Sequence, residues 1–268
     1  QQKVDDVIKA TKMLKEAGLK VVYHMMPGLP GMTPETDLRD FKRLFEEEDF
    51  QPDMLKLYPT LLVKGSPLSR NPGDFVPYDT ETAAKVVADL KEIVPPYVRI
   101  QRIQRDIPKP QIIAGVMNSN LRQYARKELR KRGKKCNCIN CRELWRAQID
   151  PSTAELREIK YKASGGTEYF ISYESGTKLL AYVRLRLDEN ATVRELKVTG
   201  QAANIGKTST GVQHMGLGSK LMKIAEEKSK NYDKIRVTHG AGTRLYYEKL
   251  GYILEENYMV KNGRNNNK

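Results

Sequence analysis

The stretch from Gln213 to Gly218 has residue types and spacing that suit the binding of a phosphate group. It reads Gln-His-Met-Gly-Leu-Gly and leads into a segment whose apolar residues recur at helical spacing. Two glycines let the backbone come close to a ligand, and the N–H groups at the start of a helix attract negative charge. The pattern predicts a pyrophosphate cradle, and an ordinary glycine loop before a helix is the alternative.

All three cysteines of the chain fall within six residues, in the spacing C-x-C-x-x-C, at Cys136, Cys138 and Cys141. Cysteines that only fill a core would be scattered, so this clustering favours a metal site in a reducing compartment. Zinc usually takes four ligands, which leaves one to be found. The candidates for it are His24, His214, His239, a carboxylate or water. One alternative is an iron–sulfur cluster with one open iron. The other is three thiols that bind no metal.

A run of basic residues with a single acid, Glu128, directly precedes the cysteines. On a helix these side chains would contact several phosphates, which makes binding salt-dependent and largely independent of base sequence. The net charge of +14 for the whole chain favours a polyanionic partner over the alternative of a solvated helix face. The predicted nucleic-acid contacts are Arg122, Arg126, Lys127, Arg130, Lys131, Arg132, Lys134 and Lys135.

Length and composition limit the classes of protein to which this chain can belong. The 268 residues are enough for two domains, and 30% charged with 39% hydrophobic residues is typical of a soluble globular protein. No apolar run approaches the roughly 20 residues of a membrane span, and no secretory signal is recognisable, so we expect a cytoplasmic location and no membrane partner. The chain begins with Gln1 and leads at once into a helical pattern, from which we expect a fragment of a longer protein.

Strands and helices alternate over the first hundred residues. A helix from residue 4 ends at Gly18, and later helices are predicted from the Thr33-Pro34 start and over 81–93. Strands are predicted over 19–25, 54–58 and 98–103. This alternation predicts a parallel sheet of the kind that can form part of a barrel. The loop that follows His24 at the end of the first strand is a site candidate, and a rigid turn with a core histidine is the alternative.

The second half of the chain has a different pattern. Antiparallel strands are predicted across 168–199, with a hairpin turn at Ser175-Gly176 and a final strand from residue 193. After the glycine cradle and its helix come a strand over 234–238, a short helix over 244–250 and a last strand over 252–260. This order, with Q-x-x-G-x-G in its place, resembles the acetyl-CoA-dependent GNAT superfamily of acetyltransferases.

Six segments in order closely resemble the catalytic subunit of Elongator, a family of tRNA-modifying enzymes. They are VVYHMMPGLPG (21–31), LKLYPTLLVKGSPL (55–68), QRIQRDIPKP (101–110), CNCINCRE (136–143), QHMGLG (213–218) and GTRLYYEKLGY (242–252). The resemblance implies an α/β chain with the end of a radical S-adenosylmethionine barrel over 1–110, a basic helix and zinc linker over 111–150, and a GNAT-type α+β domain over 151–268. It implies tRNA and further Elongator-type subunits as partners. The implied reaction forms 5-carboxymethyluridine at the wobble position, with acetyl-CoA as the source of the two-carbon unit.

The resemblance also implies roles for single residues. Acetyl-CoA would be held by Gln213, Gly216 and Gly218 with the neighbouring backbone of His214, Met215 and Leu217, and its pantetheine arm by the backbone of Leu196 and Val198. Tyr246 and Tyr247 match a tyrosine pair near the thioester, where a hydroxyl can bind the carbonyl or protonate the departing thiolate. Adjacent helical residues do not share a face, so we expect one of the two to be functional. Lys56 and His24 would line the cofactor end of the barrel.

Two departures from the family pattern limit what we expect of this chain. The cysteine motif that binds a 4Fe-4S cluster is missing ahead of Cys136, so S-adenosylmethionine and the cluster are expected only in the full-length protein. We therefore expect this chain to bind acetyl-CoA but not to cleave S-adenosylmethionine. The loop over 200–212 is short, which leaves its substrate contacts open. A protein lysine N-acetyltransferase and a non-catalytic tRNA-binding module are the alternative functions.

Overall fold

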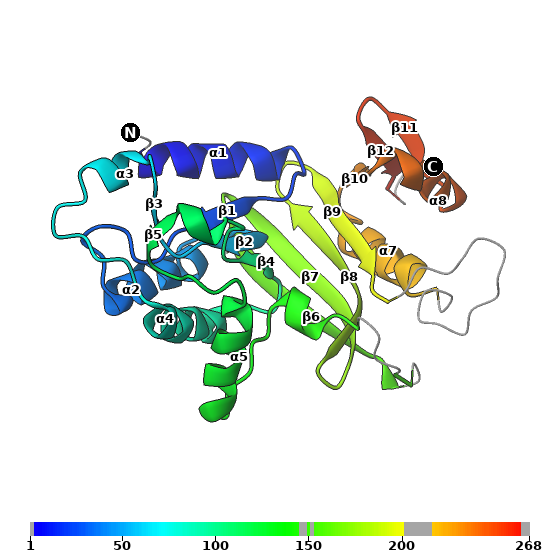
Figure 1. Ribbon diagram of the computed structural model, residues 1–268. Coiled ribbons are helices and arrows are strands. Elements are labelled where there is room, and N and C mark those ends of the chain that lie inside the picture. The colour runs from blue at the N-terminus through cyan, green and yellow to red at the C-terminus, as the bar shows by residue number, and fades with distance from the viewer. Residues whose placement is uncertain (1–2, 145–148, 151–152, 201–215, 264–268) are drawn as a thin grey trace. The chain divides into compact units, whose positions relative to one another are not determined.

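The structure, a computed structural model, describes residues 3–144, 149–150, 153–200 and 216–263 (Figure 1). The chain divides into two compact units. One unit is Val21–Cys141, which we call the parallel unit after its sheet. The other joins Gln1–Lys20 to Arg142–Lys268, and we call it the mixed unit. None of the helices in the described part of the chain has both the length and the apolar character needed to cross a membrane.

The parallel unit is built on a three-stranded sheet with the order β1-β2-β4, in which both neighbouring pairs run parallel. Its strands are β1 (Val22–Met25), β2 (Met54–Leu57) and β4 (Arg99–Ile103). Because the strand order follows the chain order, right-handed crossovers place both connecting helices on one face. Leu55 and Leu57 are fully buried, and the half-buried Lys56 between them points to the opposite face. The predicted parallel sheet is confirmed.

The two crossover helices begin at capping residues that the sequence displays. α2 (Pro34–Glu46) follows Thr33, whose hydroxyl oxygen accepts the N–H of Thr36 at 3.3 Å. α4 (Thr80–Ile93) follows Asp79, whose carboxylate accepts the N–H of Thr82 at 2.7 Å. Such caps satisfy N–H groups that have no acceptor inside the helix, which is why these starts can be read from the sequence.

The remaining elements of the parallel unit follow the third strand or line its loops. The basic run forms α5 (Leu121–Lys131), which packs against α4. The short elements are α3 (Pro67–Arg70), η1 (Lys109–Gln111), α6 (Ile139–Arg142) and the antiparallel pair of β3 (Leu62–Val63) with β5 (Ile112–Ala114). These short elements were not predicted from the sequence, because two to four residues are too few for a periodic pattern.

The mixed unit contains a seven-stranded sheet with the order β11-β12-β10-β9-β8-β7-β6. Its strands are β6 (Glu155–Ala163), β7 (Gly166–Ser175), β8 (Lys178–Leu187), β9 (Ala191–Val198), β10 (Lys234–Thr238), β11 (Ile253–Glu255) and β12 (Tyr258–Asn262). Every neighbouring pair is antiparallel except β9 and β10, which run parallel. The predicted antiparallel strands and the hairpin between β7 and β8 are confirmed.

The prediction of one last strand over 252–260 was wrong. This segment forms two antiparallel strands, β11 and β12, with the turn at Glu256, whose φ is +52°. No glycine marks the turn, so the sequence pattern gave little sign of it. Strand β6 was also not predicted, because most of its residues are exposed and its apolar residues do not alternate strictly with polar ones.

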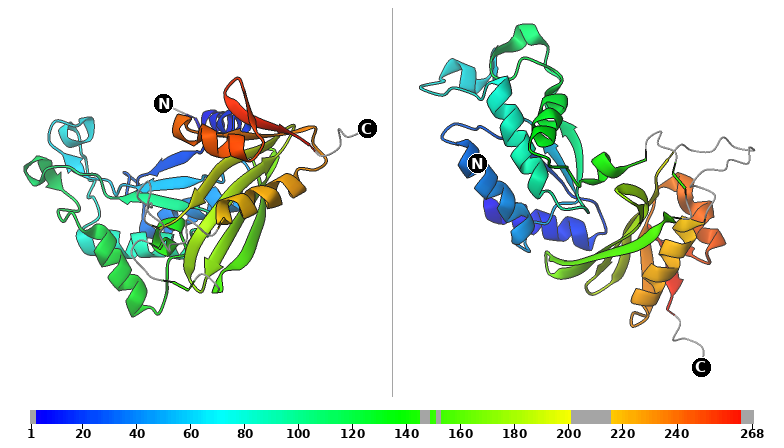
Figure 2. Two further views of the ribbon diagram at one scale, coloured as in Figure 1. Left: turned by 90° about the vertical axis from the view of Figure 1, so that its right-hand side faces the viewer. Right: turned by 90° about the horizontal axis from the view of Figure 1, so that it is seen from below.

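The two faces of the mixed sheet differ in character. α7 (Leu217–Lys228) packs against β7, β8 and β9 on one face, where Val183 and Leu185 join Leu221 in the apolar core (Figure 2). Arg184 and Arg186 alternate with these residues along β8 and therefore point to the opposite face. Both arginines are almost fully buried, so this second face is a buried layer of charged and aromatic side chains. The short helices η4 (Ala241–Thr243) and α8 (Arg244–Lys249) lie between β10 and β11 in the chain.

The first helix, α1 (Val4–Glu16), belongs to the mixed unit rather than to the parallel sheet that follows it in the chain. The fully buried Lys15 lies 3.7 Å from the carboxylate of Glu168 on β7. The guanidinium of Arg194 on β9 donates to the carbonyl of Leu19 at 2.6 Å. The expected barrel segment over 1–110 included this helix, but these long-range contacts attach it to the antiparallel sheet.

Candidate functional site

Strands β9 and β10 part after a short parallel stretch, and this leaves β9 with an edge that is free of any described strand. β10 pairs only with residues Ala191–Val193 of β9, whereas β8 follows β9 as far as Val198. The N–H of Thr199 donates to Leu180 of β8 at 2.7 Å, and backbone groups alternate between the two edges of a strand. The backbone N–H and C=O of Leu196 and Val198 therefore point away from β8, to an edge where no described strand pairs with them.

The glycines of the cradle lie at the start of α7, close to this edge. Gly216 precedes the helix with a φ of +67°, a left-handed conformation that favours glycine. A Cβ on Gly218 would lie 2.7 Å from the hydroxyl oxygen of Tyr246 and 3.7 Å from Cγ2 of Val198. Three of the site residues predicted from the sequence thus meet at one point, namely Val198 of β9, Gly218 of α7 and Tyr246 of α8. The N–H groups of the first turn of α7 have no acceptor inside the helix, so this end can receive an anion.

The two neighbouring tyrosines of α8 differ in burial. Tyr247 is 5% exposed and packs in the core, with its ring centroid 6.0 Å from that of Tyr252. Burial raises the pKa of Tyr247 to about 12. Tyr246 is 37% exposed and places its hydroxyl beside Gly218. The expectation that the two side chains face different ways is confirmed, and Tyr246 is the one at the cradle.

The other predicted cradle residues are Gln213, His214 and Met215, which lie outside the described residues. Leu217, the first residue of α7, is buried in the core, so only its backbone can serve a ligand.

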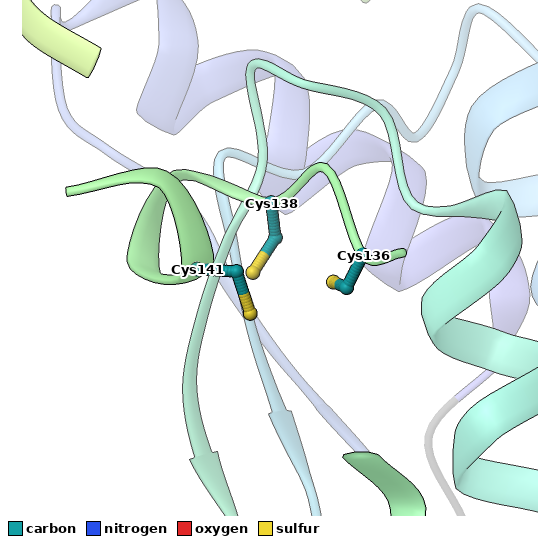
Figure 3. A group of neighbouring side chains, drawn as sticks. All are labelled: Cys136, Cys138 and Cys141. Carbon is teal, nitrogen blue, oxygen red and sulfur yellow. The ribbon is translucent and has the colours of Figure 1, made fainter. Parts of the chain in front are cut away.

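The three cysteines form a compact group, with all Sγ atoms within 4.8 Å of one another. Figure 3 shows the side chains converging from the segment after α5 and from α6. In a tetrahedral site with metal–sulfur bonds near 2.3 Å, thiolates are about 3.8 Å apart. The thiolates of an iron–sulfur cluster bind different irons and are more widely separated. The observed spacing fits one tetrahedral metal ion.

The electrostatics of this group favour a thiolate at Cys141 and a thiol at Cys136. The pKa of Cys141 is lowered, because the Cys136 and Cys138 thiols donate hydrogen bonds to it and Lys91 and Arg126 lie near. The pKa of Cys136 is raised by its hydrogen bonds to the other two sulfurs and by burial. The ammonium of Lys91 on α4 donates to Sγ of Cys141 at 3.5 Å.

None of the histidines that the structure describes is placed to be a fourth ligand of a metal ion at the cysteines. The group of potential ligand atoms contains only the cysteines, so His24 on β1 and His239 after β10 do not belong to it. His214 lies outside the described residues. A water molecule or another ligand would complete a tetrahedral site.

The basic residues of this run differ in their partners within the parallel unit. Arg132 is paired with Asp89 and, at 3.3 Å, with Glu92 on α4. The guanidinium of Arg122 is half-buried and donates to the carbonyl of Gln101 at 3.3 Å. Lys131 pairs with Glu128 at 2.7 Å but is exposed. The exposed basic residues on α5 and the segment after it are Arg126, Lys127, Arg130, Lys131, Arg132, Lys134 and Lys135, of which Arg132 is the one paired with acids of α4.

The carboxyl ends of the parallel strands carry a second polar region. Lys56 on β2 is in register with His24 on β1 and with Arg102 on β4, so a row of basic side chains crosses one face of the sheet. The loop after β1 is held in place by the buried Asp37, whose carboxylate accepts the N–H of Gly28 and the hydroxyl of Tyr78, both at 2.8 Å. Burial raises the pKa of Asp37.

Sequence reasoning missed Lys91 and Asp37 as parts of these sites. A lysine among the apolar residues of α4, spaced with Val87 and Leu90 on the inward face, was the available signal for Lys91. Asp37 lies on the inward face of α2 with Phe41 and Leu44, which was a similar signal. A charged residue on an apolar face needs a partner, but the sequence does not name it.

Comparisons with known proteins find one family model and several similar proteins. Residues 52–131 match the family model of the Radical_SAM C-terminal domain. The tRNA uridine(34) acetyltransferase of Methanocaldococcus jannaschii is 43% identical, over 96% of this chain and 52% of that protein. Elongator complex protein 3 of Saccharomyces cerevisiae is 38% identical, over 96% of this chain and 51% of that protein. The solved structure of archaeal Methanocaldococcus infernus Elp3 with an N-terminal deletion superimposes with a TM-score of 0.90 at 42% identity, covering 98% of this chain and 67% of that one.

The matched residues 52–131 lie within the parallel unit. The chain belongs to the family of tRNA uridine(34) acetyltransferases and Elongator complex protein 3. The resemblance stated from the six sequence segments is confirmed. The chain spans about half the length of the curated relatives it matches.

Proposed function

We propose that this chain takes part in the modification of the wobble uridine of tRNA and uses acetyl-CoA bound at the cradle of the mixed unit to form 5-carboxymethyluridine. The observation that carries the proposal is the meeting of the free β9 edge, the start of α7 and the Tyr246 hydroxyl at one point. The names of the relatives supply the tRNA uridine as substrate. We assign the mixed unit to the GNAT type on this geometry.

Each part of the cradle matches one part of acetyl-CoA. The pyrophosphate would bind the N–H groups of the first turn of α7, where the macrodipole favours negative charge. The pantetheine amides would pair with the backbone of Leu196 and Val198, as a further strand pairs with a free edge. Tyr246 would then place its hydroxyl near the thioester, where it can bind the carbonyl or protonate the leaving thiolate. Tyr247 would support α8 from the core.

The exposed face of α5 is the proposed contact for the tRNA backbone. Its lysines and arginines would bind phosphates and release counterions, which gives affinity without reading the base sequence. Arg132 and Arg122 are engaged by their own unit and would contribute less. Further Elongator-type subunits are proposed partners, by analogy with the relatives.

We propose zinc as the metal of the cysteine group, in a structural role. Three thiolates within 4.8 Å of one another suit its tetrahedral coordination, and clustered thiolates are ligands that zinc prefers. A closed structural site would fix the segment that follows α5 onto α4. Water or a residue outside the described part would be the fourth ligand.

The radical chemistry of the family would require S-adenosylmethionine and an iron–sulfur cluster, which together supply a carbon-centred radical when bound. The 268 residues contain no cysteines besides the metal group, so we derive no step through a cluster for them. Lys56, with His24 and Arg102 in register, would offer positive charge to the carboxylate or phosphate groups of ligands at the carboxyl ends of the strands.

The test has two stages. Calorimetric titration with acetyl-CoA measures binding directly, and release of free CoA thiol measures hydrolysis with and without tRNA at fixed salt. We expect binding in the absence of tRNA, and hydrolysis that a tRNA with a wobble uridine stimulates more than a tRNA with another wobble base. Tyr246→Phe should lower hydrolysis while Tyr247→Phe, a matched change in the core, should leave it near the wild-type rate.

The two stages fail in different ways. Absence of acetyl-CoA binding would remove the cradle from the proposal. Binding with hydrolysis indifferent to tRNA would favour a protein acetyltransferase over a tRNA-modifying enzyme.

A further inference from the structure

A charged side chain, Lys91, lies beside the three cysteines. None of the proposals above makes it a metal ligand. It lies on α4, is fully buried, and donates to Sγ of Cys141 at 3.5 Å. Long charged side chains are almost never fully buried without a partner, because the loss of hydration must be compensated. The cysteine sulfurs are therefore the partners that compensate this buried ammonium group for its lost hydration.

Charge balance explains what the lysine contributes. Three thiolates carry three negative charges, and a divalent ion neutralises two of them. One negative charge would remain in a buried site, where an unbalanced charge is costly. The ammonium of Lys91 supplies one positive charge at hydrogen-bond distance from a thiolate.

The other cations near the group differ from Lys91. Arg126 on α5 contributes to the lowered pKa of Cys141, but it is exposed to solvent. Solvent screens such a charge, so it adds little to a buried site. Arg132 is occupied by Asp89 and Glu92.

We propose that Lys91 is a positioning residue of the metal site, where its ammonium group orients the Cys141 thiolate through an N–H···S hydrogen bond and neutralises the charge left by a divalent ion on three thiolates. The inference rests on the proposed metal site. It makes the site a three-thiolate centre with a built-in counter-ion. It also protects the bound thiolates from electrophiles, because a hydrogen bond from a cation withdraws electron density from sulfur.

The experiment uses Co²⁺ as the probe, because its complexes with thiolates absorb visible and near-ultraviolet light. Affinity is measured by competition with a chelator for the wild type, Lys91→Gln, Lys91→Arg and Lys85→Gln. Lys85 lies on the same helix but is exposed and paired with Glu81, so it is the matched control. The rate at which iodoacetamide alkylates the Co²⁺-loaded protein reports on the thiolates themselves.

We expect Lys91→Gln to weaken Co²⁺ binding about 10- to 100-fold, as is usual when a residue that orients a metal ligand is lost. Its sulfur-to-cobalt charge-transfer band should move to longer wavelength, and alkylation should become faster. Lys91→Arg, which keeps the charge and the donors, should retain most of the affinity, and Lys85→Gln should match the wild type.

Three outcomes would overturn the inference. Wild-type affinity and alkylation rate in Lys91→Gln would show that the lysine does not act on the thiolates. Loss of Co²⁺ affinity in a folded Lys91→Arg, measured against the wild type, would indicate direct coordination by a neutral amine instead of a counter-ion, and this comparison holds even if Lys91→Gln does not fold. Failure of the wild type to bind Co²⁺ would remove the metal site itself, which is a separate result.

Discussion

At the scale of single residues, the cradle depends on a close contact between a glycine and a tyrosine. The hydroxyl of Tyr246 occupies the space that a side chain at position 218 would need. The sequence alone offered Tyr246 and Tyr247 as equals, and burial separates them. A functional hydroxyl must be reachable by the ligand, and only that of Tyr246 lies at the free edge of the sheet.

Gly218→Ala should weaken acetyl-CoA binding about tenfold, because the new methyl group displaces the Tyr246 hydroxyl and costs one or two hydrogen bonds. Calorimetry measures this affinity. In a Tyr246→Phe background the same substitution should cost less, since the displaced atom is gone. Gly242→Ala, where no atom lies within 4 Å of the new Cβ, is the control. Full additivity of the two substitutions would contradict the contact.

Tyr247 leads to a prediction about alkaline stability. Its folded pKa of about 12 lies above the value near 10 of an unfolded tyrosine. Both states hold the proton below pH 10, but between about pH 10 and pH 12 only the unfolded chain releases it, so stability falls as the pH rises. Urea unfolding near pH 9 and pH 11.5 should show a smaller loss for Tyr247→Phe than for the wild type. Equal losses would mean that Tyr247 ionises normally in the folded protein.

At the scale of elements, α5 with its C-terminal end and α1 each carry basic side chains in two different environments. The outer side chains of α5 are free to meet phosphates, whereas Arg132 is bound to α4. On α1, the exposed Lys12 pairs loosely with Glu16, whereas Lys15 lies buried against the sheet. Equal formal charges therefore have unequal roles, which helical spacing and tertiary packing decide together.

Replacing Arg126, Lys127 and Arg130 by Gln should weaken tRNA binding and make its salt dependence shallower, by about one unit of slope for each phosphate that the variant no longer binds. Filter binding or fluorescence anisotropy over a range of salt measures both quantities. Arg132→Gln removes the same kind of charge from an engaged residue and should change the slope much less. An equal effect per charge in both variants would show that net charge acts, and not the outer face of α5.

Glu168→Gln should lower the free energy of unfolding by about 3 to 5 kcal/mol, because Lys15, Arg186 and Arg194 would lose a shared buried anion. Urea denaturation measures the change. Glu16→Gln affects only an exposed pair with Lys12 and should stay within about 0.5 kcal/mol of the wild type. A small effect at Glu168 would mean that the charged layer tolerates an unbalanced cation.

At the scale of the whole molecule, the two units carry different proposed sites: one has the proposed metal site and the basic helix, and the other has the proposed acetyl-CoA cradle. The cysteines and Lys91 all belong to the parallel unit. Metal binding to the folded state stabilises the unit that contains the ligands.

Removing the metal with a chelator should therefore increase hydrogen exchange in peptides from α4, α5 and the cysteine segment, because the thiolates would no longer hold that segment. Exchange in β7 and β8 should change much less. Mass spectrometry of the exchanged peptides reads both regions in one sample. Unchanged exchange throughout would count against a structural metal at the cysteines.

Local patterns in the sequence determined the elements that have strong signals of their own. Thr33 and Asp79 mark helix starts because their side chains cap N–H groups, and β7 and β8 follow from strict alternation around Ser175-Gly176. The candidate metal ligands could also be named, since three cysteines within six residues leave little choice. These features depend on neighbours a few positions away, which is the range that periodicity and capping rules cover.

Only the tertiary structure decided the features that join distant positions. The attachment of α1 to the mixed unit depends on Lys15 meeting Glu168, and the role of Lys91 depends on Cys141, fifty residues later. The choice of Tyr246 over Tyr247 depends on how α8 packs beside α7 and β9. A side chain's partner across the fold is set by packing of whole elements, because burial leaves a charged or polar group stable only where its counterpart arrives.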